Sequence, residues 1–387
     1  MKIAWFCIPA HGHTNPTLAL VKEMVDSGHE VFYFSFEDFK EKIEKTGATY
    51  ISCDDCNFEM KDKDNAERVA KDIAFATELL VNSTLALDEM IANKIKIINP
   101  DLIISDSVSY WGKLTAIKYS IPYISSTTTF AFNKYSSAYM KHGIGELVKM
   151  MFSMPKVNKQ LKRLRQNGYP VKNILDIIQN DNETNTIVYT SKFYQPCSNT
   201  FSDKYCFIGP SIRPIETPFE KTSNITIFIS MGTIVKNQKI YRYCIDAFSK
   251  TDYQVIISAS SSNIKFEDLP DNIRIYDFVD QMAVLSITDV FITHCGMNSA
   301  SEGLYFEVPL VLCPQTSEEE AVAKRTEELG AGIWLKSINN SSNIINTVNK
   351  ILNEPSYKQA ALEISKSFKE CKGAKEARNF IEKTILN

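Results

Sequence analysis

Residues 290–302 read VFITHCGMNSASE, and this stretch decides the fold class of the second half of the chain. An apolar run leads directly into His294, a turn follows at Gly296, and helix-compatible residues come next. A strand, a tight turn and a helix start in this order are typical of a parallel α/β sheet. We expect Asn298 and Ser299 to cap the helix and to leave its first backbone N–H groups facing outward. Because a helix N-terminus carries a positive dipole, these groups and His294 together suit a diphosphate.

Glu302 lies one turn into the same predicted helix. Its carboxylate is placed to accept hydrogen bonds from the paired hydroxyls of a ribose. Residues 299–302, SASE, also match a capping box, which needs no ligand. The motif alone leaves both interpretations open.

The length and charge of the chain narrow the class of protein. Its 387 residues predict two or three domains, each large enough for a core of its own. The formal net charge of −3 argues against a nucleic-acid or anionic-membrane footprint. No apolar run approaches the length of a membrane span, and the N-terminal residues read as a strand rather than a signal peptide. We therefore expect a soluble, cytoplasmic protein.

The nine cysteines have no regular spacing, and most lie within or beside apolar runs. This usage predicts reduced thiols rather than a disulfide framework. Cys53 and Cys56 form the one C-x-x-C, and no second cysteine pair or histidine lies near them. The sequence therefore predicts no zinc site.

Short apolar runs alternate with helical patterns in both halves of the chain. In the first half we predict strands at 2–7, 30–35, 48–51, 101–105 and 121–124, with a long helix between the third and fourth. In the second half we predict strands at 225–230, 254–258, 273–275, 290–293 and 310–312. The fold class is therefore α/β, with two Rossmann-like, doubly wound domains that face a cleft. Neither half contains G-x-G-x-x-G or a Walker-type G-K-S/T.

Composition suggests where these domains begin and end. We predict an N-terminal domain at 1–210, a Pro-, Thr- and Ser-rich linker at 211–224 and a C-terminal domain at 225–370. The closing helix at 371–387 can pack back onto the first domain. An insert at 136–170 has helical spacing and a methionine-rich run, which fits either a core helix or the wall of an apolar pocket.

In a doubly wound sheet with strand order 3-2-1-4-5, strands one and four are neighbours, and ligands bind at their carboxyl ends. In the first domain this rule brings together His13, from the segment PAHGHTNP at 9–16, and Asp106, at the end of strand four. An aspartate that holds one imidazole nitrogen leaves the other able to take a proton near neutral pH. The corresponding positions of the second domain are Ser230, Gly232 and Thr233, beside the turn at His294.

Several of these residues also have structural interpretations. Asp106 can cap a helix beginning near Val108, and His11 is an alternative base. Phe278, after the third strand of the second domain, fits a core position as well as a base-stacking platform. The run Glu318-Glu319-Glu320 behind Ser317 fits an acidic first helical turn with a capping box.

Taken together, these motifs resemble the UDP-sugar-dependent glycosyltransferases of the two-domain, GT-B type of family 1. The similarity covers essentially the whole chain and is closest to the bacterial macrolide and flavonoid glucosyltransferases. The segment AHGHTNP at 10–16 is similar to the family's G-H-x-x-P, which implies that His13 is the catalytic base. Residues 100–106, PDLIISD, are similar to the segment that supplies its partner, here Asp106.

The resemblance also implies a set of donor-binding residues in the second domain. Residues 293–302 are similar to the donor signature H-C-G-W-N-S-x-x-E. The segment FVDQ at 278–281 occupies the place of W-x-P-Q. Residues 314–319 occupy the place where the family holds the sugar. The resemblance implies that residues at and around the His294 turn bind the diphosphate and that Glu302 binds the ribose. It also implies that the 278–281 segment binds the base and that the carboxylates of Glu318 and Glu319 bind the sugar. These residues are Ser230, Gly232, Thr233, Phe278, Val279, Gln281, His294, Gly296, Asn298, Ser299, Glu302, Glu318 and Glu319.

Two positions depart from the family pattern. Phe278 replaces the usual tryptophan, which reduces the stacking area and makes a preference for uracil over thymine less secure. Glu319 replaces the usual glutamine, so the amide donor to the sugar is lost. The donor sugar is therefore open, with glucose as the first expectation.

The expected reaction is the inverting transfer of a hexose from a UDP-sugar to a hydroxyl of a small, mostly apolar acceptor such as a macrolide, a flavonoid or another phenolic natural product, with no metal or other cofactor. Expected acceptor walls are Trp111, Phe130, Phe132 and the segment 140–154. A nucleotide-sugar epimerase of the same architecture is the alternative enzyme. An inactive nucleotide-sugar binding protein is the alternative from another class.

Overall fold

The computed structural model describes residues 1–54, 68–69, 72–136, 144–178, 180, 182–232, 239–259, 269–336 and 340–386, with the backbone alone at 144–151. The chain forms two compact units. The first comprises Met1–Ser211 and Cys371–Asn387, and the second comprises Ile212–Glu370.

The first unit is built on a seven-stranded sheet with the order β3-β2-β1-β4-β5-β6-β7, in which every neighbouring pair is parallel. Its strands are β1 (Lys2–Phe6), β2 (Glu30–Ser35), β3 (Thr49–Ser52), β4 (Leu102–Asp106), β5 (Tyr123–Thr127), β6 (Thr186–Val188) and β7 (Tyr205–Phe207). The central strands β1 and β4 are hydrogen-bonded neighbours, as the doubly wound rule predicts.

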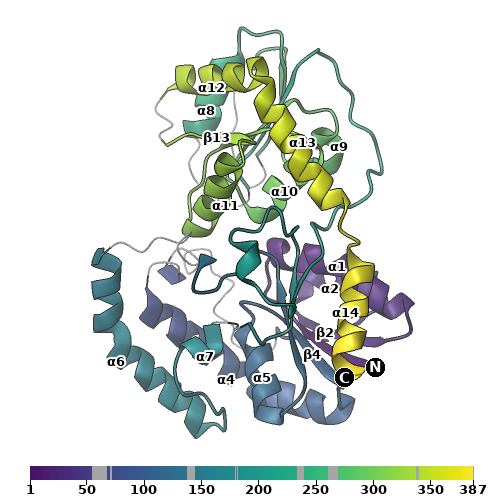
Figure 1. Ribbon diagram of the computed structural model, residues 1–387, viewed down its shortest axis with the longest axis vertical. Helices are drawn as coiled ribbons and strands as arrows, with labels where there is room; N and C mark the ends of the chain where they lie inside the picture. Colours follow the sequence, from purple (N-terminus) through teal and green to yellow (C-terminus); the bar gives the residue numbers. More distant parts are fainter. Residues whose placement is uncertain are drawn as a thin grey trace. The chain divides into compact units, whose positions relative to one another are not determined.

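Helices connect and cover these strands (Figure 1). They are α1 (His11–Asp26), α2 (Lys40–Glu44), α4 (Ile73–Ile98), α5 (Tyr110–Tyr119), α6 (Ile144–Gln166), α7 (Leu175–Ile178) and α14 (Ala374–Leu386), with short 3-10 turns η1 (Glu37–Phe39) and η4 (Ser198–Thr200). No helix in the described ranges is both long and apolar enough to cross a membrane.

Strand β1 is buried on both faces, and its side chains alternate between two cores. Ile3 and Trp5 belong to the cluster that includes residues of α1, whereas Ala4 and Phe6 belong to the cluster under α4 and α5. All four side chains are fully buried. The continuous apolar run of β1 therefore follows from the helical layers on both sides of the sheet.

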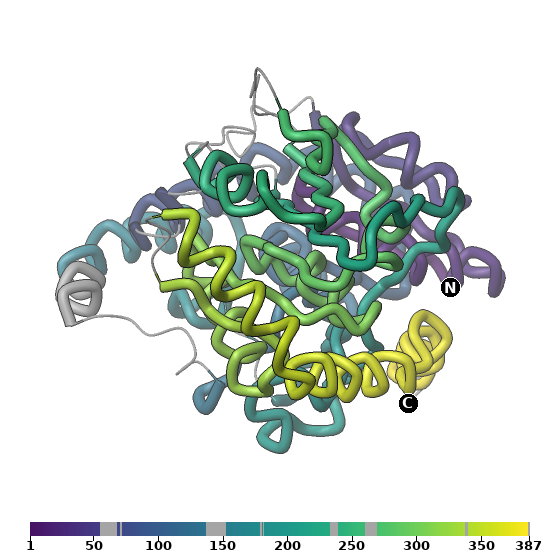
Figure 2. The backbone as a smooth tube through the Cα atoms, turned by 90° about the horizontal axis from the view of Figure 1, so that it is seen from above, coloured from purple at the N-terminus to yellow at the C-terminus, as the bar shows by residue number. Residues whose placement is uncertain are grey.

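Helix α14 completes the first unit from the far end of the chain, and the two chain ends lie near each other in both views (Figure 1, Figure 2). Ala377 and Ile381 are fully buried in the same cluster as Ile3 and Trp5. Arg378 forms an ion pair with Glu23 of α1 at 2.9 Å. Apolar burial, together with this ion pair, thus holds α14 against α1.

The second unit repeats the pattern with a six-stranded parallel sheet in the order β10-β9-β8-β11-β12-β13. Its strands are β8 (Thr226–Ser230), β9 (Gln254–Ser258), β10 (Ile273–Tyr276), β11 (Val290–Thr293), β12 (Leu310–Leu312) and β13 (Gly332–Trp334). Its helices are α8 (Lys239–Phe248), α9 (Gln281–Leu285), α10 (Met297–Tyr305), α11 (Ser317–Glu328), α12 (Ser341–Asn353) and α13 (Pro355–Lys369).

The two parallel-sheet α/β domains confirm the predicted fold class, and all ten predicted strands are present within two residues of their expected starts. The strands β6, β7 and β13 are not predicted by the sequence patterns. Each has only three residues, so its pattern is weak; β12 is equally short, but it consists of Leu and Val alone, which marks a buried strand. In β13 the first position must be glycine, because a Cβ at Gly332 would lie 2.5 Å from the Leu310 carbonyl oxygen. Glycine is not typical of strands, so the sequence signal of β13 is weaker still.

Candidate functional site

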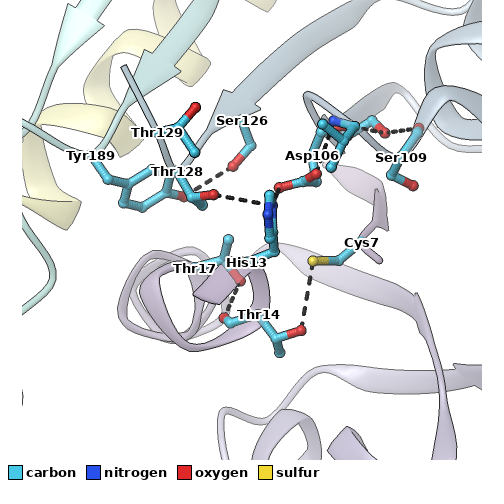
Figure 3. A network of polar contacts seen from close by, with 12 residues as sticks. Cys7, His13, Thr14, Thr17, Asp106, Ser109, Ser126, Thr128, Thr129 and Tyr189 are labelled. Atoms are coloured by element: carbon cyan, nitrogen blue, oxygen red, sulfur yellow. Dashed lines mark hydrogen bonds and ion pairs between the residues drawn. The ribbon is translucent and has the colours of Figure 1, made fainter. Parts of the chain in front are cut away.

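In the first unit, the side chains of the two predicted catalytic residues are in direct contact. His13 lies in the first turn of α1, and Asp106 is the last residue of the neighbouring strand β4. Although 93 residues separate them, His13 Nδ1 lies 2.7 Å from Asp106 Oδ2. Figure 3 shows the two side chains pointing toward each other. The adjacency of β1 and β4 brings the imidazole and the carboxylate together.

The surroundings of the pair define how it is oriented. The Asp106 side chain is fully buried, and its Oδ1 accepts a hydrogen bond from the Val108 N–H at 3.0 Å. The Thr128 hydroxyl lies 3.1 Å from His13 Nδ1 (Figure 3). Because an ionised carboxylate can only accept, Nδ1 carries the hydrogen toward Asp106, and Nε2 of the neutral ring has the lone pair that takes up a proton. Asp106 thus both orients His13 and starts the turn before α5.

His11, the alternative base, has a different environment. It is exposed, and its ring contacts the edge of Phe39, with the ring centres 5.0 Å apart. Burial of part of the ring, and then the neighbouring Lys42, lower the pKa of His11. Of the two histidines, His13 is the one with a carboxylate on its ring nitrogen.

Two of the expected acceptor walls, Trp111 and Phe130, need correction. Trp111 and Phe130 are each 2% exposed, so their rings are core side chains of α5 and of the segment after β5. Phe132 is partly exposed. Of the segment 140–154, residues 140–143 lie outside the described residues, and Phe152 is 81% exposed. The error arises because an apolar residue in a loop or helix start suits a core as well as a pocket.

In the second unit, the His294 ring is enclosed by two glycines. A Cβ at Gly232 would lie 2.8 Å from His294 Nε2, and a Cβ at Gly296 would lie 2.6 Å from the same atom. Gly232 also has a positive φ of 72°, and Cys295 has a φ of 71°. The glycine positions and the left-handed turn therefore allow the backbone to approach the imidazole on both sides.

The electrostatics of His294 are those of an enclosed ring. Its Nδ1 is buried and makes no hydrogen bond to the described residues. Burial lowers the pKa of His294, while the Glu319 carboxylate and the backbone of Ser230 act in the opposite direction. Ser230 ends β8 and is paired with Thr293 of β11, so these strand ends meet at the His294 turn. Thr233 lies outside the described residues.

Helix α10 begins at Met297, and its N-cap is Gly296 with no side-chain cap. The predicted capping role of Asn298 and Ser299 is therefore wrong, because both already lie in the first turn. The first backbone bond of the helix runs from the Ala300 N–H to the Gly296 carbonyl at 3.0 Å. The backbone before Ala300 lies at the positive end of the helix dipole, which suits an anion.

Glu302 does not form a capping box with Ser299. Instead, Gln281 Nε2 donates to Glu302 Oε2 and lies 3.3 Å from Ser299 Oγ. Burial raises the pKa of Glu302 to about 7, while Gln281 and Arg213 lower it. Gln281, at the start of α9, thereby links two residues of α10.

The segment before α9 presents one open ring. Phe278 is 79% exposed, so the interpretation of Phe278 as a core residue is wrong. The next residue, Val279, is 9% exposed and belongs to the core. Asp280 caps α9 by accepting from the Met282 N–H at 3.1 Å. An exposed phenylalanine beside Gln281 is available for stacking on a planar ring.

The acidic start of α11 does contain a capping box, but its N-cap is Thr316 rather than Ser317. Glu319 Oε2 accepts from the Gln315 N–H at 2.7 Å and from the Thr316 N–H at 3.2 Å. The Glu319 carboxylate is therefore held by backbone amides of its own helix start. Glu318, one residue earlier, is exposed.

The described residues contain no group of three or more His, Cys, Asp or Glu side chains arranged to hold a metal ion. All eight cysteines in the described ranges are free thiols, including Cys53; Cys56 lies outside those ranges.

Comparisons with known proteins agree with this architecture. The model of the erythromycin biosynthesis protein CIII-like C-terminal domain matches residues 242–372. The uncharacterized UDP-glucosyltransferase YojK of Bacillus subtilis (strain 168) is 30% identical over 97% of this chain and 96% of its own length. The demethyllactenocin mycarosyltransferase of Streptomyces fradiae is 27% identical over 86% of this chain and 75% of its own length. The solved structure of the glycotransferase of kitacinnamycin has the same fold, with a TM-score of 0.85 at 22% identity over 99% of this chain and 98% of that chain.

Proposed function

Because the chain belongs to the family 1 glycosyltransferases of the two-domain GT-B type, we propose that it transfers glucose from UDP-glucose to a hydroxyl of a small apolar natural product, with inversion at the anomeric carbon. The contact that carries this proposal is the 2.7 Å pair of His13 and Asp106. The name of the B. subtilis relative supports UDP-glucose as the donor, and that of the S. fradiae relative supports a natural-product acceptor.

In the proposed reaction, His13 Nε2 removes the proton from the acceptor hydroxyl. The acceptor oxygen attacks the anomeric carbon from the face opposite the leaving group, and the bond from that carbon to the diphosphate oxygen breaks. UDP leaves with the electron pair of that bond. The proton remains on His13, where the buried Asp106 carboxylate stabilises the imidazolium until the ring releases it to solvent.

The second unit is proposed to hold the donor. The diphosphate would bind at the N-terminus of α10 together with His294, Asn298 and Ser299, and with Gly232 and Thr233, which follow β8 in the sequence. The partly exposed His294 ring and its buried Nδ1, which makes no hydrogen bond to the residues that the structure describes, support this assignment. Cationic or dipolar groups at this position stabilise the charge that develops on the departing diphosphate, so no metal ion is required.

The nucleoside and the sugar would contact the remaining side chains. The ribose hydroxyls would donate to Glu302, and the uracil would stack on Phe278. Glu318 is the carboxylate proposed to accept from the sugar hydroxyls. Glu319 is less suited to that role, because its carboxylate already accepts two backbone N–H groups.

The proposal is tested by incubating the protein with a panel of phenolic and macrolide acceptors and several UDP- and TDP-sugars, followed by mass spectrometry. We expect a mass increase of one hexose on an acceptor with UDP-glucose. His13→Ala should abolish transfer and leave UDP affinity largely unchanged, which calorimetric titration measures. Equal turnover in that variant would remove His13 from the mechanism.

A second arm separates the alternatives. Incubation with the UDP-sugar alone should leave the sugar configuration unchanged. Epimerisation without acceptor would establish the epimerase instead, and UDP binding without turnover across the panel would favour a binding protein.

A further inference from the structure

Helix α6 and the segment that follows it have a charge unlike that of the whole chain. Residues 147–175 contain seven lysines and arginines and no aspartate or glutamate, in a chain whose net charge is −3. The overall charge therefore conceals a local basic segment. A local excess of this kind determines which surfaces the protein approaches.

The inner face of α6 is fixed to the first unit. Val157, Leu161 and Leu164 are at most 1% exposed and belong to one cluster with Leu80 and Val81 of α4. The residues that follow Pro155 in α6 thus form a packed helix, which lies at the outer edge of the unit beside α4 (Figure 1). Its orientation determines which side chains face away from the core.

The outward face carries one aromatic ring and three lysines. Phe152 is 81% exposed, and Lys156, Lys159 and Lys162 follow it at intervals of four, three and three residues. This spacing places them on successive turns of the face opposite Leu161. All three lysines are exposed, and none pairs with a carboxylate of the described chain. The two arginines of this helix differ from the three lysines, because both arginines donate hydrogen bonds to oxygen atoms of the protein itself.

We propose that this outward face of α6 docks on an anionic lipid membrane. The three ammonium groups contact lipid phosphates and carboxylates, and the Phe152 ring inserts at the boundary between headgroups and acyl chains. Basic residues and an aromatic ring on one side of a helix form this type of interfacial contact. The exposed ring favours a membrane over a nucleic-acid duplex, since the phosphate backbone of a duplex neutralises the lysines but leaves the ring in water.

The proposal does not depend on the glycosyl transfer proposed above. If both hold, α6 brings the enzyme to the phase in which an apolar acceptor accumulates. Activity toward a water-soluble acceptor, in the absence of vesicles, is therefore the readout that separates the two proposals.

The experiment is co-sedimentation of the full chain with vesicles of phosphatidylcholine alone or with about 30 mol% phosphatidylserine, an anionic lipid. We expect binding to the anionic vesicles only. Replacing all three lysines by glutamine should weaken partitioning about 100-fold, because each basic residue near an anionic leaflet contributes roughly fivefold. Raising the salt to about 0.5 M should have a similar effect on the unmodified protein, because the Debye length shortens.

Matched variants control for charge and for folding. The triple change Lys250→Gln, Lys350→Gln and Lys372→Gln removes three exposed charges elsewhere and should leave vesicle binding unchanged. Replacing the three α6 lysines by arginine should retain binding. All variants should transfer sugar in solution as the unmodified protein does.

Three outcomes would overturn the proposal. The first is equal sedimentation with neutral and anionic vesicles, and the second is equal loss of binding in the control triple variant. The third is tighter, α6-dependent binding to a single-stranded or duplex oligonucleotide than to vesicles, measured by fluorescence anisotropy.

Discussion

Replacing Glu302 by glutamine should stabilise the second unit, and the gain should increase with pH. Burial raises the pKa of Glu302 from 4.5 to about 7. The folded chain therefore binds the proton more tightly than the unfolded chain does. With a raised pKa, the contribution of Glu302 to stability is fully present below pH 4.5 and is lost as the pH rises through about 7. Glutamine has no charge to desolvate and retains an oxygen that can accept from Gln281 Nε2.

The magnitude follows from the difference between the two pKa values. The full difference corresponds to roughly 3 kcal/mol at pH 8, since each pKa step is worth 1.36 kcal/mol. Glu302 is only partly buried by surface area, so solvent screening reduces this figure. We therefore expect the difference in free energy of unfolding between Glu302→Gln and the unmodified chain to rise in favour of the variant by about 1–3 kcal/mol from pH 5 to pH 8.

The assay is urea unfolding at several pH values, followed by circular dichroism and by tryptophan fluorescence. Trp334 is the sole tryptophan of Ile212–Glu370, so its emission reports on the second unit. Glu363→Gln provides the control, since this exposed carboxylate lies on α13 of the same unit and should show no such trend.

A gain that is independent of pH would mean that the effect comes from packing rather than from the charge of Glu302. A loss of stability that grows toward pH 8 would refute the reasoning outright, because it would require the ionised carboxylate to be favourable in the folded state.

Three further changes test other parts of the structure. Asp106→Asn should lower kcat about 10²–10⁴-fold and leave the UDP affinity unchanged, because the amide no longer holds His13 in the tautomer with the hydrogen on Nδ1. Steady-state kinetics measure kcat, and calorimetric titration measures the UDP affinity. Gly296→Ala should weaken UDP binding about tenfold to 100-fold, because its Cβ would lie 2.6 Å from the His294 ring; normal affinity would exclude that ring from the diphosphate site. Ile381→Ala should destabilise the first unit by about 3 kcal/mol in urea unfolding, since its side chain is fully buried; a loss below about 1 kcal/mol would contradict tight packing of α14.

The sequence was sufficient to predict that His13 and Asp106 meet. The prediction needs only the strand order and the positions of the strand ends, and both follow from long apolar runs alternating with helical patterns. Small errors in strand boundaries do not change which strand ends are neighbours. The prediction of this contact therefore tolerates errors of one or two residues in the bounds of each element.

Helix starts were predicted less well. Ser, Thr, Asn and Gly all favour N-cap positions, so several residues within one turn compete for the same role. In α10 the cap is Gly296 rather than Asn298 or Ser299, and in α11 it is Thr316 rather than Ser317. The backbone angles at each turn decide between them, and these depend on how the preceding strand enters.

Exposure was the property least visible in the residue pattern. Trp111 and Phe130 are buried, whereas Phe278 and Phe152 are open to solvent. All four are large apolar side chains beside a strand end or in a helix, and nothing local distinguishes them. Their burial depends on which elements pack over them.

The amino-acid sequence by itself determined the two doubly wound sheets, the presence of a helix after His294 and the pairing of His13 with Asp106. Periodicity and strand order are properties of local residue patterns, which is why they can be read without coordinates. Only the tertiary structure decided that Glu319 is held by its own helix start, that Gln281 contacts Glu302, and that the lysines of α6 share one outward face. These features arise where side chains from different turns or elements compete for the same partner, and packing in three dimensions settles that competition.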